Sequence, residues 1–256
     1  MYPVLFRLGA LSVGSYGVML ALAFLACWAV ARWYLPRHGV ARDVATDLVL
    51  AAAIGGIVGA RALHVATDWP TYAANPLWIA QLQRGGMVFY GGLAGGAIAV
   101  AAYTMLRKLP VPVIADGAAL TVPLGSAIGR LGCFLNGCCG GETTSAWFGV
   151  TFPGATVPVV PTQLLDSGAN ALILAVLLHL AVRHRPRPGI LWWSYLALYG
   201  ASRFSVEMVR VNPQVAFGLS QAQLISVPVF LAGVAGLAWM LIRRPERAAT
   251  DGEVRS

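Results

Sequence analysis

Residues 8–31, LGALSVGSYGVMLALAFLACWAVA, contain no charged side chain and lie between Arg7 and Arg32. A helix needs roughly 20 mostly apolar residues to cross the hydrocarbon core of a bilayer, so this stretch predicts a membrane span. The 256-residue chain is 58% hydrophobic and only 11% charged, whereas soluble domains carry about 25% charged residues. The composition therefore excludes a soluble globular enzyme, a disordered protein and a nucleic-acid-binding module, despite a net charge of +8.

Apolar runs of similar length recur along the chain and predict an all-α, polytopic membrane protein with seven transmembrane helices. The expected spans are about 9–31, 48–67, 86–106, 111–133, 162–182, 189–209 and 220–242. Residues 1–243 are expected to form a single integral membrane domain, with 134–160 as a Gly-, Cys- and Pro-rich loop. The charged segment 244–256 is expected to be a frayed tail.

The basic residues predict the orientation, because loops rich in Lys and Arg stay on the cytoplasmic side of a membrane. Most of the 18 basic residues fall in one set of alternate loops and in the C-terminal segment. We therefore expect the N-terminus and the 134–160 loop outside, and the C-terminus in the cytoplasm.

Ionisable residues gather in the outward half of the expected spans. Such groups cost about 3 kcal/mol or more at membrane depth unless they are paired or hydrated, so each is a functional candidate. Arg203, Glu207 and Arg210 are four and three residues apart and share one helical face. Since Glu207 can neutralise only one arginine, we expect this face to keep a surplus positive charge. Arg61 and Arg130 lie toward the outer ends of two other spans.

The four arginines together predict an anion site. A single arginine at a helix end is more often a snorkelling anchor. Four on the side that should be poor in basic residues favour binding of phosphate, which the guanidinium fork suits. We expect them to converge on a phospholipid head group at the outer leaflet. A transporter of an anionic solute is the alternative, although no internal repeat typical of transporters is visible.

Glycines are paired on both sides of the start of the third expected span, as Gly85-Gly86 and Gly91-Gly92. Small residues at such positions let helices approach closely. Paired glycines at a helix start can also turn backbone amides toward an anion. Both interpretations stay open from the sequence.

The stretch 129–141, GRLGCFLNGCCGG, holds three of the four cysteines. Cys133, Cys138 and Cys139 lack both the C-x2-C spacing and the nearby His of common zinc sites. The outward face of a membrane is oxidising, so we favour a disulfide or buried thiols and expect no metal. A thiol-based sensor is a further alternative, which predicts essential cysteines and dispensable arginines.

These segments resemble the prolipoprotein diacylglyceryl transferases of bacteria, over nearly the whole chain from Tyr16-Gly17 to Gln223. Residues 85–93, GGMVFYGGL, are similar to a family motif that normally contains Phe-His-Gly-Gly-Leu. Residues 129–137 look like the signature around the family's essential arginine. Tyr199-Gly200, leading to Arg203, is similar to its late arginine motif.

The resemblance implies transfer of the diacylglyceryl group of phosphatidylglycerol to the lipobox cysteine thiol of a prolipoprotein. A thioether forms and glycerol phosphate leaves. The implied location is the bacterial inner membrane, and the implied partners are phosphatidylglycerol, the precursor's signal-peptide region and membrane lipid, with no cofactor and no nucleic acid. A paralogous lipid-modifying transferase with another acceptor is the alternative among enzymes.

The resemblance also implies roles for particular residues. The expected catalytic residues are Arg130, Arg203, Tyr90 and Glu207. The expected substrate-binding residues are Tyr16, Arg61, Gly86, Gly91, Gly92, Gly137, Gly140 and Arg210.

Three positions depart from the family pattern. Tyr90 stands where most members have His, Cys133 replaces the usual Asn, and Cys138 stands where an acidic residue is common. A free tyrosine is a poor base at neutral pH. We therefore consider His64, three residues after Arg61 on the same helical face, as a possible base. The alternative for His64 is an ordinary helix-end residue at the interface.

Overall fold

The computed structural model describes residues 2–8, 11–82 and 85–242, and the chain divides into two compact units, 1–138 and 139–256. The predicted 244–256 tail lies outside the described residues. The elements of the first unit are β1 (Val4–Leu8), β2 (Leu11–Gly14), α1 (Ser15–Tyr34), the 3-10 helix η1 (Leu35–His38), α2 (Arg42–Thr67), α3 (Trp69–Ala74), the 3-10 helix η2 (Pro76–Ala80), α4 (Phe89–Leu106) and α5 (Val111–Asn136).

The second unit contains three long helices and a short hairpin. Its elements are α6 (Thr162–His179) with the π-helical turn η4 (Leu180–His184), α7 (Ile190–Glu207), β3 (Gln214–Ala216), β4 (Leu219–Ser220) and α8 (Gln221–Ile242). The loop after α5 is tied down by backbone hydrogen bonds, from Gly141 N to Val160 O at 2.9 Å and from Glu142 N to Val209 O at 3.3 Å. The first bond joins the two ends of the loop, and the second holds the loop against the segment that follows α7.

Of the helices in the described ranges, six are long and apolar enough to cross a membrane. They are Ser15–His38, Arg42–Thr67, Phe89–Leu106, Val111–Asn136, Thr162–His184 and Gln221–Ile242. The prediction of an all-α polytopic membrane fold is thus confirmed. The remaining long helix, α7, carries Arg203 and Glu207, which reduce its apolar character.

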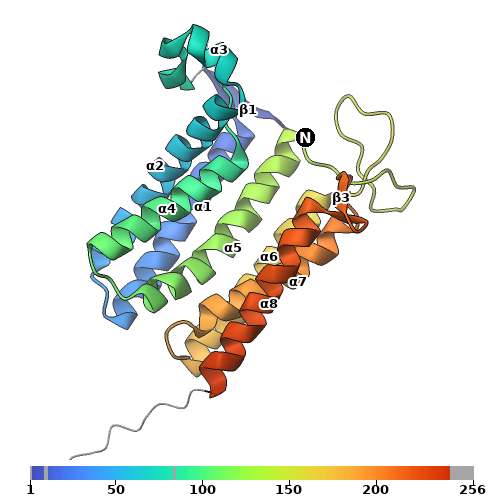
Figure 1. Ribbon diagram of the computed structural model, residues 1–256. Coiled ribbons are helices and arrows are strands. Elements are labelled where there is room, and N and C mark those ends of the chain that lie inside the picture. The colour runs from blue at the N-terminus through green and yellow to red at the C-terminus, as the bar shows by residue number, and fades with distance from the viewer. Residues whose placement is uncertain (1, 9–10, 83–84, 243–256) are drawn as a thin grey trace, which may run out of the picture. The chain divides into compact units, whose positions relative to one another are not determined.

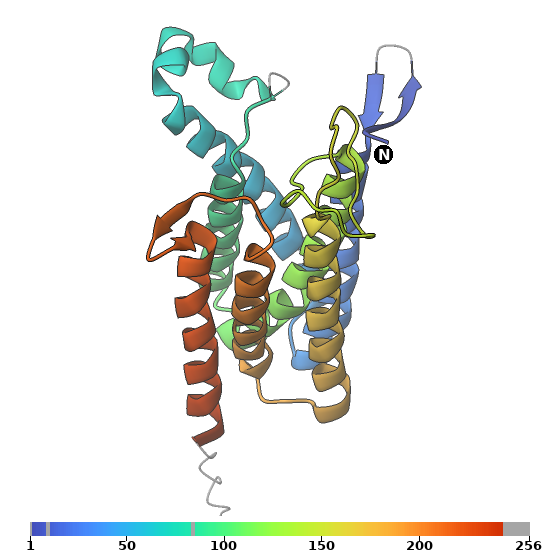
Figure 2. The ribbon, with the colours of Figure 1, turned by 90° about the vertical axis from the view of Figure 1, so that its right-hand side faces the viewer.

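The first span begins later than the sequence predicts. Residues 11–14, which the sequence predicts as helix, instead form β2, which pairs antiparallel with β1, and α1 begins at Ser15. The main-chain N–H of Ser15 donates to Pro3 O at 3.0 Å, which ties the helix start to the first strand. In both views this hairpin lies at the same end of the first unit as α3 (Figures 1 and 2).

Helices α2 and α4 pack with their backbones almost in contact (Figure 1). A Cβ added to Gly55 would lie 2.6 Å from Gly95 O, and one added to Gly59 would lie 2.3 Å from Gly91 O. No side chain fits at such distances, so small residues are required on this face. In the second unit α7 and α8 pack in the same way, since a Cβ on Gly233 would lie 2.3 Å from Ala197 N.

Replacing Gly59 by Ala is expected to destabilise the first unit, because the new methyl group would overlap the α4 backbone. Overpacking of this kind costs about 1–3 kcal/mol. Gly56→Ala is the matched control on the same helix, since its Cβ would lie 3.5 Å from Gly92 O, an ordinary contact. Thermal unfolding in detergent should show a lower midpoint for Gly59→Ala and an unchanged or higher midpoint for Gly56→Ala. Equal midpoints for the two variants would contradict the close approach.

Candidate functional site

Arg61 lies in the last two turns of α2 and is buried, with 5% of its surface exposed. Its guanidinium donates to five backbone carbonyl oxygens, which equals the number of its N–H donors. The distances are 3.0 Å from Nε to Ile79 O, 2.6 Å from Nη1 to Gly85 O and 3.1 Å to Gly86 O. Nη2 donates to Trp78 O and, at 3.2 Å, to Gln81 O. Arg61 thus holds together the connection between α3 and α4.

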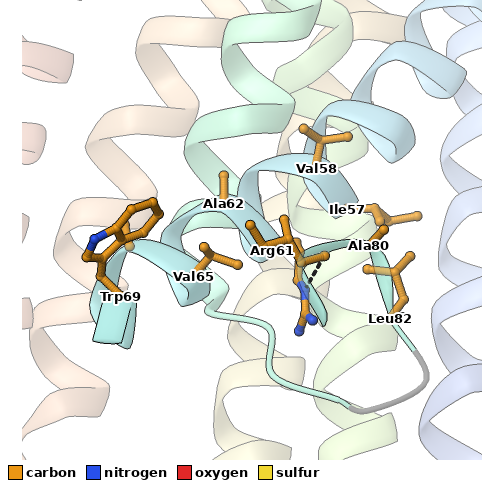
Figure 3. Close-up of a pocket in the computed structure, with 10 residues that line it drawn as sticks. Ile57, Val58, Arg61, Ala62, Val65, Trp69, Ala80 and Leu82 are labelled. Carbon is orange, nitrogen blue, oxygen red and sulfur yellow. Dashed lines mark hydrogen bonds between the residues drawn. The ribbon is translucent and has the colours of Figure 1, made fainter. Parts of the chain in front are cut away.

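The structure shows Arg61 in this structural use, and substrate binding by Arg61 stays a prediction. A phosphate would have to displace carbonyl oxygens that already satisfy the guanidinium. An apolar cavity of about 510 Å³ lies beside it, with Ile57, Val58 and Trp69 among its lining residues (Figure 3). Figure 3 shows the guanidinium pointing toward the connection between α3 and α4. The cavity therefore suits a hydrocarbon group better than a charged head group.

The 85–93 motif runs from this loop into the first turns of α4. Gly86 has φ +79°, and a Cβ there would lie 2.1 Å from His64 Nε2. The His64 ring also packs edge-on against Tyr72, with ring centroids 5.8 Å apart. Tyr90, in contrast, is 57% exposed on the first turn of α4. The structure thus leaves the Tyr90 ring accessible and covers one edge of the His64 ring.

Several expected substrate-binding glycines have packing roles. Gly91 and Gly92 face α2, where a Cβ would lie 2.4 Å from Gly59 O and 3.3 Å from Gly56 O, respectively. Gly137 ends α5 in the left-handed conformation, with φ +77°. A Cβ on Gly140 would lie 2.9 Å from Val159 Cγ2. These glycines shape the backbone around the motifs through close contacts and turns.

Arg130 is half-buried in the last two turns of α5. Two residues further on, Gly132 faces α1, and a Cβ there would lie 3.3 Å from Cδ2 of Tyr16. The Tyr16 ring, 43% exposed, therefore lies beside the part of α5 that carries Arg130. The family resemblance singles out both residues, and they come from neighbouring helices of the first unit.

The second unit contains a network of charged side chains centred on Glu207, whose side chain is 1% exposed. Glu207 Oε2 pairs with Arg203 Nη2 at 2.9 Å and lies 3.7 Å from Arg210 Nε. Its other oxygen, Oε1, accepts hydrogen bonds from Ser220 Oγ at 2.7 Å and from Asn212 Nδ2 at 2.6 Å. The buried carboxylate is thus held by partners on both oxygens.

Asp166 of α6 corrects the prediction of a surplus positive charge. Its Oδ2 pairs with Arg210 Nη1 at 3.0 Å. Two carboxylates therefore face two guanidinium groups, and the cluster of Asp166, Arg203, Glu207 and Arg210 is formally neutral. The spacing of residues 203, 207 and 210 describes one helical face only, whereas this counterion comes from the neighbouring helix α6.

Arg203 differs from Arg210 in how its donors are used. Arg203 Nη1 is buried, and no hydrogen-bond acceptor within the described part of the chain reaches it. A buried donor without a partner costs about 1–3 kcal/mol, more if it is charged. The remaining N–H groups of this guanidinium can be satisfied by an anionic oxygen. Arg203 therefore has the geometry of a ligand-binding residue, with Glu207 fixing its orientation.

The network also includes residues that the sequence analysis missed. Ser220 N donates to Gln223 Oε1 at 3.0 Å, and Ser220 Oγ bonds Glu207. Asn212 precedes β3, Ser220 ends β4, and Gln223 lies in the first turn of α8. The Ser-x-x-Gln spacing at 220–223 is a recognised helix-start pattern and could have identified Ser220 and Gln223. No local motif identifies Asn212.

Arg61→Lys is expected to loosen the connection between α3 and α4, because an ammonium group cannot reach five carbonyls in a planar fan. Losing charged hydrogen bonds worth about 1.5–3 kcal/mol each should speed amide exchange there at least tenfold. Hydrogen exchange of the amides of residues 77–82 and 85–88 measures this. Arg42→Lys, at the exposed start of the same helix, is the control. Equal exchange in both variants would show that Arg61 does not order the connection.

Known proteins match this chain over almost its full length. A model of the prolipoprotein diacylglyceryl transferase family matches residues 3–239. A phosphatidylglycerol–prolipoprotein diacylglyceryl transferase of Geobacter sulfurreducens is 37% identical over 252 residues, covering 94% of this chain and 96% of the relative. Proteins of the same name from Pseudoalteromonas atlantica and Dehalococcoides mccartyi are 33% and 36% identical, covering 97% and 88% of this chain and 92% and 88% of their own lengths. The chain belongs to the prolipoprotein diacylglyceryl transferase family.

Proposed function

We propose that this protein transfers the diacylglyceryl group of phosphatidylglycerol to the lipobox cysteine thiol of a prolipoprotein. The relatives that are similar to this chain over most of its length are named for this activity. In the reaction the glycerol carbon exchanges its bond to phosphate oxygen for a bond to sulfur. Glycerol phosphate leaves, and the thiol proton passes to a base or to the leaving group.

The observation that carries the proposal is the buried, unpartnered Nη1 of Arg203. In this reaction negative charge grows on the phosphate as the carbon–oxygen bond breaks. A fixed guanidinium in a water-poor site stabilises such charge without having to reorganise. Arg203 therefore has the role of holding the phosphate and stabilising it as it leaves.

The remaining site residues support this step. Glu207 orients Arg203, while Arg210, paired with Asp166, keeps Glu207 in place. Arg130 acts on the same phosphate, as the family signature implies, and Tyr16 meets the lipid. The apolar cavity beside Arg61 is suited to an acyl chain.

The nucleophile belongs to the acceptor, so no serine or cysteine triad is required. Tyr90 is our first choice for the residue that contacts the acceptor thiol, because its ring is exposed at the start of α4. His64 is the alternative base. Its ring packs directly against the backbone of Gly86, four residues before Tyr90.

We further propose that α7 is a seventh span, with the N-terminus and the 134–160 loop outside and the C-terminus in the cytoplasm. At 18 residues α7 is as long as α4, which is apolar enough to span. Its charged residues are ion-paired, which lowers the cost of placing them in the membrane. The bacterial inner membrane is the proposed location.

Arg203→Lys tests the phosphate role, because lysine keeps a positive charge near Glu207 but loses the planar fork. We expect kcat/KM for transfer of acyl-labelled phosphatidylglycerol to a lipobox peptide to fall about 10²-fold, as when a transition-state donor is removed. Arg183→Lys, on the exposed η4 turn of the same unit, should transfer like the wild type.

Unfolding midpoints for both variants separate loss of activity from loss of folding. Transfer at the wild-type rate by Arg203→Lys would refute the phosphate role. A folded wild-type protein that transfers nothing to the peptide would refute the proposed reaction and favour a paralogue with another acceptor.

A further inference from the structure

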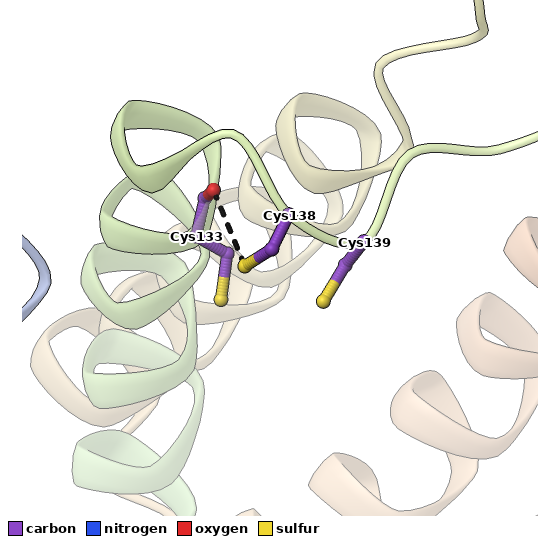
Figure 4. A group of neighbouring side chains, drawn as sticks. All are labelled: Cys133, Cys138 and Cys139. Atoms are coloured by element: carbon purple, nitrogen blue, oxygen red, sulfur yellow. Dashed lines mark hydrogen bonds between the residues drawn. The ribbon is translucent and has the colours of Figure 1, made fainter. Parts of the chain in front are cut away.

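Three thiols meet where α5 ends. Cys133 lies in the last turn of the helix, while Cys138 and Cys139 follow it directly in the chain. The three Sγ atoms all lie within 4.8 Å of one another. Figure 4 shows the sulfur atoms gathered on one side of the turn. Cys139 is the first residue of the second unit, but its peptide bond to Cys138 fixes it beside the helix end.

The backbone at the helix end brings these side chains together. Gly137 and Cys139 both have left-handed backbone conformations, with φ of +77° and +68°. Such a conformation is unusual for a residue other than glycine and needs support from its surroundings. Cys138 Sγ donates to Cys133 O at 3.6 Å, which directs the thiol back toward the helix (Figure 4). The C-x4-CC spacing thereby produces a cluster without a C-x2-C pair.

Three neighbouring thiols suit a thiophilic metal ion. Zinc–thiolate bonds are about 2.3 Å long, so tetrahedral ligands lie about 3.8 Å apart. The sulfur separations are at most 4.8 Å, so they exceed that value by about 1 Å at most, a change that side-chain rotation can supply. A disulfide would use two of the three sulfurs and leave the third unmatched, whereas a metal uses all three. None of the four cysteines, all of which are in the described residues, is joined in a disulfide.

We propose that Cys133, Cys138 and Cys139 form a three-thiolate site for Zn²⁺. Binding releases the three thiol protons to solvent, and water fills the fourth position of the tetrahedron. Cys139 is exposed and Cys133 and Cys138 are half-buried, so an ion can enter from solvent. This differs from the sequence-based expectation of a disulfide or buried thiols, which rested on the cysteine spacing, the lack of a nearby His and the oxidising outward face.

The position of the site gives it a structural consequence. Cys133 follows Arg130 by three residues on α5, about one helical turn away on the same face. An ion bound there would clamp the end of α5 and the start of the following loop. It would thereby fix the helix turn that presents Arg130. The metal site does not depend on the proposed reaction.

The test uses full-length protein purified in detergent, reduced, stripped of metal and titrated with Co²⁺ as a spectroscopic stand-in for Zn²⁺. The wild type should bind one Co²⁺ per chain, with thiolate charge-transfer bands in the near ultraviolet and tetrahedral bands in the visible. Stoichiometric Zn²⁺ should remove both sets of bands.

Single substitutions identify the ligands. Cys133→Ser, Cys138→Ser or Cys139→Ser should each weaken Co²⁺ binding on the order of a hundredfold. Cys27→Ser is the matched control, since the Cys27 thiol donates to Thr121 O between α1 and α5 and is not part of the cluster. Unfolding midpoints confirm that each variant is folded.

Two results would overturn the proposal. One is the absence of thiolate charge-transfer bands in the reduced, folded wild type, or their persistence in each of the three serine variants. The other is a disulfide between any two of the three cysteines, found by alkylation and mass spectrometry in protein taken directly from membranes.

Discussion

The buried ion pair between Glu207 and Arg203 is the interaction on which the second unit's chemistry depends. A carboxylate with 1% of its side chain exposed needs partners that offset its burial. Glu207 Oε1 accepts hydrogen bonds from Asn212 and Ser220, while Oε2 is ion-paired with Arg203 and accepts no hydrogen bond from the described residues. These contacts join the end of α7 to the start of α8. They also fix one side of the Arg203 guanidinium and leave Nη1 for another acceptor.

Arg61 and Arg203 differ in how many of their N–H donors have acceptors within the described part of the chain. Arg61 is buried and has a carbonyl oxygen for each of its donors, so its contribution is to order the connection that leads to Tyr90. Arg203 is also largely buried, but part of its hydrogen-bonding capacity is unused. Burial alone therefore does not distinguish the two arginines, whereas the unsatisfied donor does, and it is the basis for proposing Arg203 as the anion-binding residue.

The sequence predicts the large features well, because long apolar runs and their lengths follow directly from the bilayer. It predicts α2, α4, α5 and α8 and the clustering of Arg203, Glu207 and Arg210. It fails at residues 11–14, which carry no charge and form strand β2 in place of helix. It also misses the carbonyl partners of Arg61 and the pairing of Arg210 with Asp166, since both contacts join segments distant in sequence. Such contacts leave no local pattern.

The most direct measurement of the central claim is an experimental structure with phosphatidylglycerol bound. The account predicts a non-bridging phosphate oxygen about 2.7–2.9 Å from Arg203 Nη1, the distance of a charge-assisted hydrogen bond. Glu207 should keep its pair with Nη2 in the same structure. A phosphate bound away from Arg203, with Nη1 donating instead to a protein carbonyl, would contradict the account.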